Sequence, residues 1–437
     1  ISEELPNYKV VLVGDDGDRT KIIDQHEWPK NVVITAGETT IGELVTVIEN
    51  ADCLVVQDSG IMHIGNALGK KLVALYGPTN YSATRPRGEK SRILFSKTEA
   101  FSVMHSSRLS EKALAEKYLE LHAVELDPAK QIVITASGVQ ALNVGIRCTL
   151  DPGDEVLLLT PAWPNGSAIV QMFNGIPREV PMVLNSTRYE IDFDHLQACL
   201  TSRSRLLLYT SPSNPLGWVA SEQDQEALLE FCRRHDLWLM ADEVYERIYY
   251  GGSVAPSILR KCDRNDPVIV VQSFSKTYCM TGWRLGWIVT RPDAARKTTE
   301  LNEFVISHAP AMAQKAGEVA LRKGEDEIKL MRTHLRENLN FCRQFLQEMP
   351  GVTLPEPEGT FYLFPRIEGL ADSFEFCRKL LVEMRVGLAP GVAFGKGGEG
   401  SVRICYAADR TILGLAMKRM ATFLRDGDMS RRFFRTS

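Results

Sequence analysis

Short apolar segments rich in Val, Ile and Leu recur along most of the chain, and stretches long enough for one helix separate them. Apolar runs of this kind are typical of strands that are buried on both faces, as in a parallel sheet. Their alternation with helical stretches predicts an α/β fold with helices on the faces of the sheet. The predicted strands are residues 9–14, 31–35, 53–57 and 71–76, and then 131–135, 155–160, 204–210, 237–242, 268–273 and 285–289.

The alternation stops between residues 77 and 112. Gly77-Pro78 and Arg85-Pro86 are turn signals, and residues 96–110 are polar and lack a helical period. We therefore place a junction between two modules here. Beyond about residue 295 the chain becomes mainly helical with short strands, which predicts a smaller α+β domain. The predicted parts are residues 1–98, a junction over 99–112, a large domain over 113–292, a small domain over 293–425, and a tail over 426–437.

Charge and cysteine content exclude several classes of protein. The 51 basic and 55 acidic residues give a net charge of −4, so we expect no nucleic-acid partner. No apolar run approaches the roughly 18 residues that a membrane span needs. The 9 cysteines are scattered and form no C-x-x-C pair. This pattern predicts reduced thiols in a cytoplasmic protein, with neither a disulfide framework nor a metal site.

Polar and aromatic residues follow several predicted strands of the second module. Ser137-Gly138-Val139 ends one strand and opens a helix, where free N–H groups suit a phosphate. Trp163 follows the next strand and could stack on a flat ring, although a core position is the better explanation of this Trp when it is considered alone. Asn214, in Ser213-Asn214-Pro215-Leu216-Gly217, follows a third strand, where ligands of open α/β sheets bind. The same segment also fits a simple turn.

Charged residues follow two further strands. Asp242 ends an apolar strand, so burial of its carboxylate requires a cation, which a protonated pyridine nitrogen would supply. Tyr245 is close enough in sequence to donate a hydrogen bond to an oxygen on that ring. Lys276 follows Ser273-Phe274-Ser275, and partial burial would make its amine nucleophilic. Arg284 suits a phosphate, and Arg403 suits a substrate carboxylate, although a surface ion pair is the simpler explanation of Arg403.

Taken together, these features resemble the class I/II aminotransferases of fold type I, which use pyridoxal 5'-phosphate. The resemblance runs from about Leu109 to about Leu424. It rests on the segments SNPLG, ADEVYERIYY, SFSKTYCMTGWRLGW, EGTFYLFP and PGVAFGKGGEGSVRICYA. It implies a large α/β domain with a smaller C-terminal α+β domain. It also implies transfer of an amino group from an L-amino acid to a 2-oxo acid through a Schiff base on Lys276.

The resemblance also implies a role for each candidate residue. Lys276, Asp242 and Tyr245 are the expected catalytic residues, with Asp242 on the pyridine nitrogen. Trp163 stacks on the ring, and Asn214 and Tyr245 bond its phenolic oxygen. Arg403 binds the α-carboxylate of the substrate, with Asn214 and Trp163 beside it. The expected phosphate ligands are Ser137, Gly138, Val139, Ser273 and Arg284.

The chain departs from the family before residue 109. Family members carry a longer segment ahead of the part that matches 134–142. That segment holds an N-terminal arm, a glycine near the substrate carboxylate, and an aromatic residue that reaches the partner subunit's phosphate site. Only 109–120 (LSEKALAEKYLE) matches its end. The first part of the small domain is therefore expected to be missing. A homodimer is expected if the missing arm is not essential.

The first module carries a different pattern. Residues 57–69 (QDSGIMHIGNALG) lead into 72–80 (LVALYGPTN), and over about residues 9–96 this resembles a glycosyltransferase family, that of the lipopolysaccharide heptosyltransferases. The match covers the carboxyl-terminal, nucleotide-sugar-binding half of that fold, a Rossmann-like half-domain. Asp58, Ser59, Gly60 and His63 are its candidate nucleotide-sugar residues. A plain helix cap at Asp58 and a packing role for His63 explain the same residues.

Three hypotheses follow. In the first, the chain is an aminotransferase joined to part of a glycosyltransferase. In the second, it binds or transfers a nucleotide sugar. In the third, it is a non-catalytic relic of two joined gene fragments, whether natural or a sequence-assembly artefact.

Overall fold

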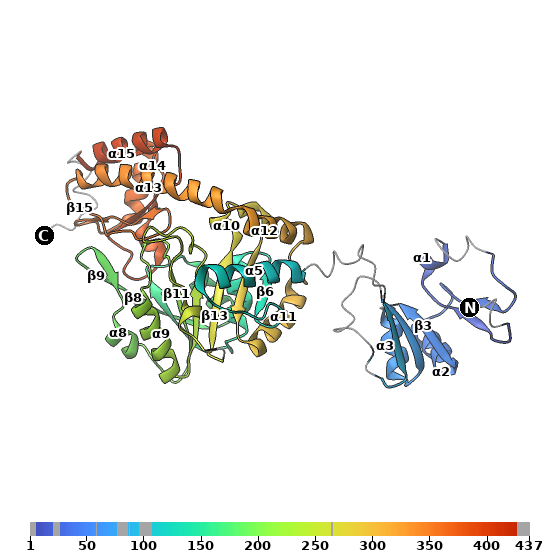
Figure 1. The fold of residues 1–437 in the computed structure, drawn as a ribbon. Coiled ribbons are helices and arrows are strands. Elements are labelled where there is room, and N and C mark those ends of the chain that lie inside the picture. Colours follow the sequence, from blue (N-terminus) through green and yellow to red (C-terminus); the bar gives the residue numbers. More distant parts are fainter. Residues whose placement is uncertain are drawn as a thin grey trace. The chain divides into compact units, whose positions relative to one another are not determined.

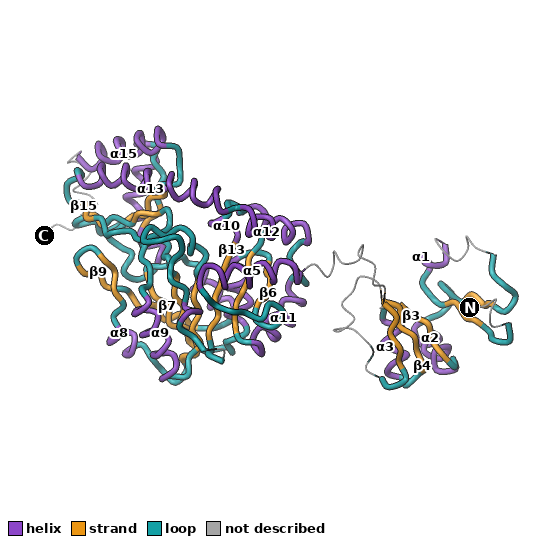
Figure 2. The backbone as a smooth tube through the Cα atoms, viewed as in Figure 1, coloured by secondary structure: helices purple, strands orange, loops and turns teal. Residues whose placement is uncertain are grey.

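The computed structural model describes residues 6–20, 27–57, 59–76, 86, 88–95, 107–263 and 265–425. The chain separates into two compact units, residues 1–105 and residues 106–437. Each unit is described by itself below. Figures 1 and 2 show the elements of both units, and each is labelled as in Figure 1.

The first unit contains two small parallel sheets. Strands β1 (Val10–Leu12) and β2 (Val32–Ile34) form one pair, and β3 (Cys53–Gln57), β4 (Lys71–Tyr76) and β5 (Ser91–Phe95) form the other sheet. The sequence predicts helices over residues 40–50 and 61–69, and the structure has α2 (Ile41–Asn50) and α3 (Gly60–Ala67) there. Thr40 and Glu43 form a capping box at α2, which satisfies its first N–H groups. The core of the three-stranded sheet is small and consists of Val56, Met62, Leu72 and Ala74.

One predicted helix of the first unit differs from the structure. The sequence predicts a helix over residues 18–28. The described helix α1 covers Asp16–Asp18, residues 19–20 continue it in π-helical form, and residues 27–28 are not helical, so the predicted end is wrong. Residues 21–26 lie outside the described part. At the start of this segment the N–H of Asp18 donates to Oδ1 of Asp15 at 2.9 Å. Such local side-chain bonds stabilise the first turn.

The second unit is built on a seven-stranded sheet of order β6-β14-β13-β12-β11-β7-β8. All its strands run parallel except β14, which pairs antiparallel with both of its neighbours. The predicted strands 155–160, 204–210 and 268–273 are present with those bounds. The strands are β6 (Ile132–Thr135), β7 (Glu155–Thr160), β8 (Ile176–Pro181), β11 (Ser204–Thr210), β12 (Trp238–Asp242), β13 (Val268–Ser273) and β14 (Gly286–Thr290).

Each face of this sheet carries its own core, because successive side chains of a strand point to opposite faces. On one face Leu157, Leu207 and Leu239 pack with residues of helices α5 and α9. On the other face Leu158 and Met240 pack with residues of α6, α7 and α11. The helices are α5 (Ser107–His122), α6 (Gly138–Arg147), α7 (Asn165–Met172), α8 (Phe193–Ala198), α9 (Glu222–Arg234), α10 (Phe274–Thr277), α11 (Pro292–Val305) and α12 (Ala311–Lys323).

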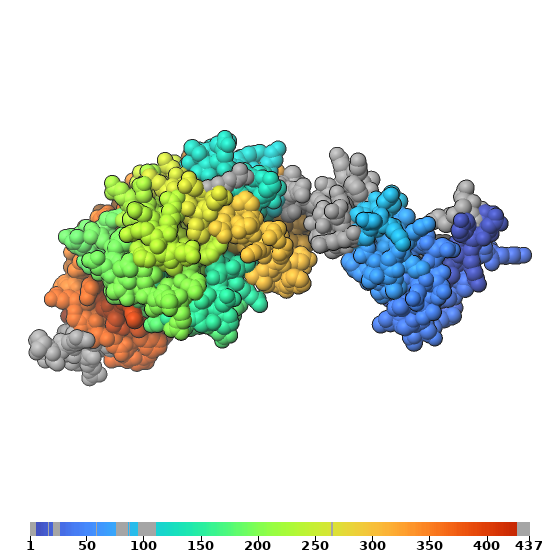
Figure 3. Space-filling model, turned by 90° about the horizontal axis from the view of Figure 1, so that it is seen from below, coloured from blue at the N-terminus to red at the C-terminus, as the bar shows by residue number. Residues whose placement is uncertain are grey.

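The C-terminal part packs around a further core that includes Tyr245 and Ile248, which follow β12. Its three helices lie together in Figure 1, and in Figure 3 its orange atoms meet the green part without a break. The elements are α13 (Glu325–Gln347), α14 (Ser373–Met384), α15 (Arg410–Arg425), β15 (Val352–Thr353), β16 (Tyr362–Leu363), β17 (Arg366–Ile367), β18 (Ala389–Pro390) and β19 (Val402–Cys405). A hairpin, β9 (Val183–Asn185) and β10 (Arg188–Glu190), belongs to the preceding part. Among the described helices, none is long and apolar enough to cross a bilayer.

Candidate active site at the carboxyl edge of the central sheet

The topology brings the candidate residues of the second unit to one edge of the sheet. Strands β6, β7, β11, β12 and β13 run parallel, so their carboxyl ends meet there, and antiparallel β14 begins there. Binding sites of open α/β sheets lie at this edge. The residues that follow or precede these ends are Ser137, Gly138, Val139, Trp163, Asn214, Asp242, Tyr245, Ser273, Lys276 and Arg284.

Asp242 ends strand β12 at this edge. Its carboxylate accepts a hydrogen bond from the N–H of Val244 at 3.3 Å and forms no ion pair within the described residues. Burial raises the pKa of Asp242 to about 7, although the Val244 hydrogen bond and the charge of Lys276 act in the opposite direction. A buried carboxyl without an ion-pair partner is prepared for a cation that is not part of the protein.

Lys276 lies in the short helix α10, directly after strand β13. Its Nζ is 5.7 Å from the ring centroid of Tyr245 and 5.8 Å from that of Phe361. Burial and the charge of Arg403 lower the pKa of Lys276, while the charge of Asp242 raises it. The lowered pKa increases the fraction of neutral amine, which is the nucleophilic and basic form.

Arg403, on strand β19, has an unusual environment for a cation. Its guanidinium carbon is 4.4 Å from the ring centroid of Tyr362, 5.1 Å from that of Phe394 and 5.2 Å from that of Trp163. Its Nη1 donates to Oδ1 of Asn214 at 3.0 Å. Its Nε is buried and has no hydrogen-bond acceptor among the described residues. The guanidinium therefore has donors left for a carboxylate, which Arg binds in a bidentate way.

Tyr245 and Tyr362 connect the Arg403 environment to the Lys276 environment. Their hydroxyl oxygens are 3.5 Å apart, and their rings pack edge to face. Burial raises the pKa of Tyr245 well above its ordinary value. The Tyr245 hydroxyl therefore stays protonated at neutral pH and can donate a hydrogen bond to an anionic oxygen.

The candidate phosphate residues form a tightly packed turn. Ser137 has φ 121°, a conformation that L residues rarely adopt, and its Oγ accepts from the N–H of Gln140 at 3.2 Å. A Cβ on Gly138 would lie 3.1 Å from Cβ of Ser273, and one on Gly286 would lie 2.6 Å from the backbone of Ser137. The first N–H groups of α6 have no acceptor inside the helix. A strained turn held this closely against β13 and β14 presents those groups toward an anion.

The remaining candidate residues at this turn are oriented by local bonds. Val139 leaves 47% of its side chain exposed. The hydroxyl of Ser273 accepts from the N–H of Ser275 at 3.1 Å and donates to the carbonyl of Leu285 at 3.4 Å. Arg284 is exposed, has φ 51°, and donates from Nη1 to the carbonyl of Thr281 at 2.7 Å. Its charge still contributes to lowering the pKa of Lys276.

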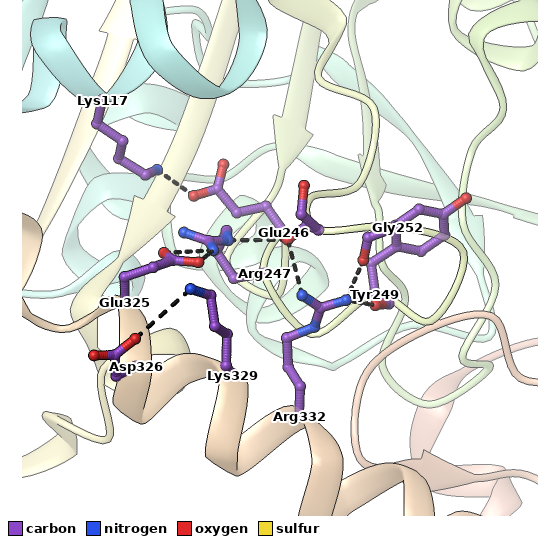
Figure 4. A network of polar contacts seen from close by, with 10 residues as sticks. Lys117, Glu246, Arg247, Tyr249, Gly252, Glu325, Asp326, Lys329 and Arg332 are labelled. Atoms are coloured by element: carbon purple, nitrogen blue, oxygen red, sulfur yellow. Dashed lines mark hydrogen bonds and ion pairs between the residues drawn. The ribbon is translucent and has the colours of Figure 1, made fainter.

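A polar network anchors the segment that carries Tyr245 (Figure 4). Lys117 of helix α5 forms a buried ion pair with Glu246, and Nε2 of His122 lies 3.3 Å from the same carboxylate. Arg247 donates to both carboxylate oxygens of Glu325, each at 2.7 Å. The turn after β12 is therefore tied to α5 on one side and to α13 on the other.

Three of the aromatic residues around the two cations, Phe361, Tyr362 and Phe394, had no role in the predictions. Phe361 and Tyr362 lie in the segment EGTFYLFP, and Phe394 lies in PGVAFGKG. Both segments were recognised, but an aromatic residue in a short apolar segment is typical of a core position. The sequence does not show that these aromatic residues lie near Lys276 and Arg403, because the fold alone brings them together.

The candidate residues of the first unit lie at the start of helix α3. Ser59 occupies the N-cap position, but its hydroxyl donates to the carbonyl of Gln57 at 3.3 Å and does not cap the helix. From the sequence, both Asp58 and Ser59 could cap this helix; for Ser59 this prediction is wrong, because its hydroxyl is bound to a backbone oxygen. Gly60 and His63 are exposed. Asp58 lies outside the described residues.

Comparison with known proteins identifies the second unit. Residues 87–414 match the family model of aminotransferase class I and II. An aspartate aminotransferase of Pyrococcus abyssi is 35% identical over 72% of this chain and 81% of that relative. This chain belongs to the class I and II aminotransferases. An aromatic-amino-acid aminotransferase of Thermococcus litoralis is 34% identical, with the same shares of 72% and 81%.

Solved structures agree with this assignment of the aminotransferase. The crystal structure of an aromatic aminotransferase from Pyrococcus horikoshii has a TM-score of 0.70 and 33% identity, and covers 74% of this chain and 87% of that one. The aspartate aminotransferase of Thermotoga maritima has a TM-score of 0.68 and 30% identity, and covers 73% and 82%. The fold is therefore fold type I, as predicted. Residues 4–113 match the model of glycosyltransferase family 9 (heptosyltransferase).

Aminotransferases of this family depend on pyridoxal 5'-phosphate, and the residues at the sheet edge fit that cofactor. Asp242 forms no ion pair among the described residues, and desolvation raises the pKa of its carboxyl, which suits a pyridinium nitrogen. Lys276 has a lowered pKa, which suits attachment to an aldehyde. The packed turn at Ser137 suits the phosphate. The aminotransferase thus transfers an amino group between an amino acid and a 2-oxo acid.

Proposed function

We propose that Lys276, Asp242 and Tyr245 are the catalytic residues of this aminotransferase and that Arg403 binds the α-carboxylate of its amino-acid substrate. The observation that carries the proposal is the environment of Arg403. The buried Nε of Arg403 has no acceptor in the described part of the chain, and the charge of Arg403 lowers the pKa of Lys276. A carboxylate on Arg403 would therefore bring the amino group and Cα of a substrate toward Lys276.

When bound, pyridoxal 5'-phosphate supplies an aldehyde that accepts the amino group and a ring that withdraws electrons from Cα. Asp242 would hold the ring nitrogen in its protonated form. Trp163 would cover one face of the ring, and Tyr245 and Asn214 would bond its phenolic oxygen. The phosphate would be held by the backbone of 137–139, by Ser273 and by Arg284.

Lys276 would first hold the cofactor through Nζ and then act as the base. Its lowered pKa would provide a neutral amine that accepts the proton from Cα of the substrate and returns it to the carbon of the cofactor that carried the aldehyde oxygen. Arg403 would meanwhile hold the carboxylate and thus the orientation of the Cα–H bond.

Borohydride reduction of the cofactor-loaded protein tests the assignment of Lys276. The wild type should retain one labelled cofactor per chain on the peptide that contains Lys276, and Lys276→Ala should retain none. Lys315→Ala is the matched control, because this lysine is exposed and pairs with Glu318 on the surface of α12. If Lys276→Ala retains as much labelled cofactor per chain as the wild type, the assignment of Lys276 as the cofactor-binding lysine is wrong.

We also propose that the aminotransferase is a homodimer. Large apolar side chains are exposed on α5, α12 and the end of α11, and patches of this kind mark interfaces. They include Leu119 (53% exposed), Phe304 (89%), Met312 (81%) and Val319 (49%). Light scattering should give a dimer mass for the wild type and a monomer mass for a Phe304→Glu/Met312→Glu variant. A wild-type monomer would contradict the proposal.

A second candidate function concerns the first unit. The match of residues 4–113 to glycosyltransferase family 9, with Ser59, Gly60 and His63 exposed at the start of α3, supports binding of a nucleotide sugar. Calorimetric titration with ADP-sugars should give saturable binding that is weakened by His63→Ala. If the titration gives no heat of binding, the first unit is better explained as a non-catalytic relic of a joined gene fragment.

The protein is also proposed to work in a reducing compartment such as the cytoplasm. All 9 cysteines are free, and several of them are buried in the cores. Free thiols in such number are typical of proteins that are kept reduced.

A further inference from the structure

We propose that Gln140 and Asn302 are positioning residues for the phosphate of the cofactor. In this inference Asn302 orients the side chain of Gln140, and Gln140 holds the turn of residues 136–138 in the conformation that binds the phosphate. The inference rests on the proposed function, in which the backbone of 137–139 holds that phosphate. It adds two residues for which no role was predicted from the sequence, and it assigns them an effect on the phosphate group alone.

The turn between β6 and α6 has a conformation that needs support. Ser137 has φ 121°, which is unfavourable for a residue that carries a Cβ. Such a conformation persists only where the surrounding contacts impose it. One contact comes from the preceding strand, because the hydroxyl of Thr135 donates to the carbonyl of Ser137 at 3.0 Å. Two further contacts come from Gln140.

Gln140 binds the turn on both sides of the strained residue. Its backbone N–H donates to Oγ of Ser137 at 3.2 Å, and its side-chain Oε1 accepts from the N–H of Ala136. Neither bond uses an N–H group of residues 137–139. Gln140 therefore binds the turn through the two flanking amides and leaves the amides of 137–139, at the start of helix α6, for an anion.

Asn302 determines which way the amide of Gln140 points. Oδ1 of Asn302 accepts from Nε2 of Gln140 at 2.7 Å, although Asn302 lies on α11, 162 positions away in the sequence. Asn302 is 4% exposed, so its side chain has little room to move. Because Nε2 is bound to Asn302, Oε1 faces the N–H of Ala136. A Gln140 amide turned the other way would set its NH₂ group against that N–H, and both groups are donors.

Loss of either side chain should therefore affect the phosphate and not the rest of the cofactor. Without Oε1 of Gln140, the N–H of Ala136 loses its acceptor and the turn loses one of its supports. The aldehyde, the ring nitrogen and the phenolic oxygen of the cofactor are assigned to Lys276, Asp242 and Tyr245, which follow other strands. The analogue 5'-deoxypyridoxal carries these three groups but no phosphate, so it isolates the contribution of the turn.

Absorbance titration of the cofactor-free protein tests the inference without turnover, because Schiff-base formation shifts the visible band of both compounds. In the wild type, pyridoxal 5'-phosphate should bind more tightly than 5'-deoxypyridoxal. Gln140→Met and Asn302→Leu should raise the Kd of pyridoxal 5'-phosphate roughly 5- to 100-fold, as expected when an amide loses its acceptor, and that of 5'-deoxypyridoxal less than about twofold. Thr298→Val is the matched control and should change neither Kd. It also removes a buried polar group from α11, but that hydroxyl lies 3.6 Å from Sγ of Cys148.

A double variant tests the connection between the two residues. Because Asn302 acts through Gln140, Gln140→Met/Asn302→Leu should weaken pyridoxal 5'-phosphate no more than Gln140→Met does alone. Additive losses would overturn the inference. If Asn302→Leu does not fold, Gln140→Met decides, because its side chain is partly exposed.

The wild type separates this inference from the proposed function. If it prefers pyridoxal 5'-phosphate and Gln140→Met changes neither Kd, or raises both equally, the inference is wrong and the proposed function stands. If the wild type binds the two compounds equally or binds neither, the phosphate assignment in the proposed function fails, and the inference fails with it.

Discussion

Arg403 donates a hydrogen bond to Asn214 at 3.0 Å, although the two residues are 189 positions apart in the sequence. Asn214 follows strand β11 of the central sheet, whereas Arg403 lies on β19 of the C-terminal part. This bond therefore joins the two parts of the second unit at the candidate active site. It also fixes one edge of a guanidinium that is otherwise surrounded by aromatic rings.

Replacing Asn214 by Ala should weaken carboxylate binding. Hydrogen bonds to charged groups contribute about 1.5–3 kcal/mol, so we expect the Kd of 3-phenylpropionate, an unreactive carboxylate, to rise roughly 10- to 100-fold. Asn185→Ala is the control, because that side chain is exposed and bonds Glu190 on the hairpin. An unchanged Kd would show that the bond to Asn214 does not orient Arg403.

Asp242→Asn should change how the stability of the cofactor-free protein depends on pH. The pKa of Asp242 is about 7 in the folded protein, because burial raises it from 3.8. Between these values the folded state binds more protons than the unfolded state, so the free energy of unfolding falls as the pH rises toward 7. The Asn side chain of the variant does not ionise, so the free energy of unfolding of the variant does not fall in this way.

Thermal unfolding at pH 5 and pH 8 measures the effect of Asp242→Asn. Relative to the wild type, the variant should gain stability at pH 8, by roughly 4 kcal/mol at most, since one pKa unit corresponds to about 1.4 kcal/mol. The difference should shrink at pH 5 and in the cofactor-loaded protein, where a ring cation would offset the charge. Asp194→Asn, at an exposed position, should follow the wild type. Parallel pH profiles for Asp242→Asn and the wild type would contradict burial of the carboxyl.

Lys117→Met should destabilise the second unit. Lys117 and Glu246 leave 6% and 3% of their side chains exposed, and removal of one partner from a buried ion pair costs about 3–5 kcal/mol. A Lys117→Met/Glu246→Met double variant should recover much of the loss, because no buried charge remains unpaired. Urea unfolding at pH 7 measures the free energy of unfolding of the single and of the double variant. A double variant as unstable as the single one would show that Lys117 acts by packing.

The same ion pair predicts a loss of stability in acid. Burial alone would raise the pKa of Glu246, but Lys117 and His122 more than offset it and bring it to about 2. A lowered pKa stabilises the folded state above the unfolded pKa of about 4.5, and this contribution is lost as the pH falls toward 2. Wild-type stability should therefore fall more steeply between pH 4.5 and 2 than that of the double variant.

Sequence patterns predicted strands best where one apolar run was bounded by polar residues. Asp242 and Lys276 each follow such a run, so the edge of the sheet at which they lie could be inferred. Strand β8 (Ile176–Pro181) was missed because Pro177, Arg178 and Pro181 interrupt its apolar pattern, which an edge strand tolerates.

Contacts between distant parts of the chain could not be inferred from the sequence. Tyr362 and Phe394 lie in short segments without periodicity, so nothing placed them over Arg403. Similarly, the spacing of Lys117 and Glu246 has no local signature, although their ion pair anchors the turn that carries Tyr245. Such contacts depend on how the C-terminal part and α5 pack on the sheet, which no local pattern encodes.

Thiol labelling gives a last prediction that reports on the cofactor site without turnover. Cys53, Cys279 and Cys405 are exposed, whereas Cys232 and Cys377 are buried. Burial also raises the pKa of Cys377 to about 12, which removes the reactive thiolate. Ellman's reagent should therefore modify the three exposed cysteines in the folded protein and the buried ones only after unfolding.

Loading with pyridoxal 5'-phosphate should slow two of these three reactions. Cys279 lines a cavity of about 380 Å³ together with Lys276, and the charge of Cys405 acts on the pKa of Lys276. Cys53 belongs to the first unit and serves as the internal control. Peptide mapping after timed labelling would follow each site. Equal rates at Cys279 and Cys405 with and without the cofactor would place the bound cofactor away from Lys276, whereas selective protection would place it beside Lys276.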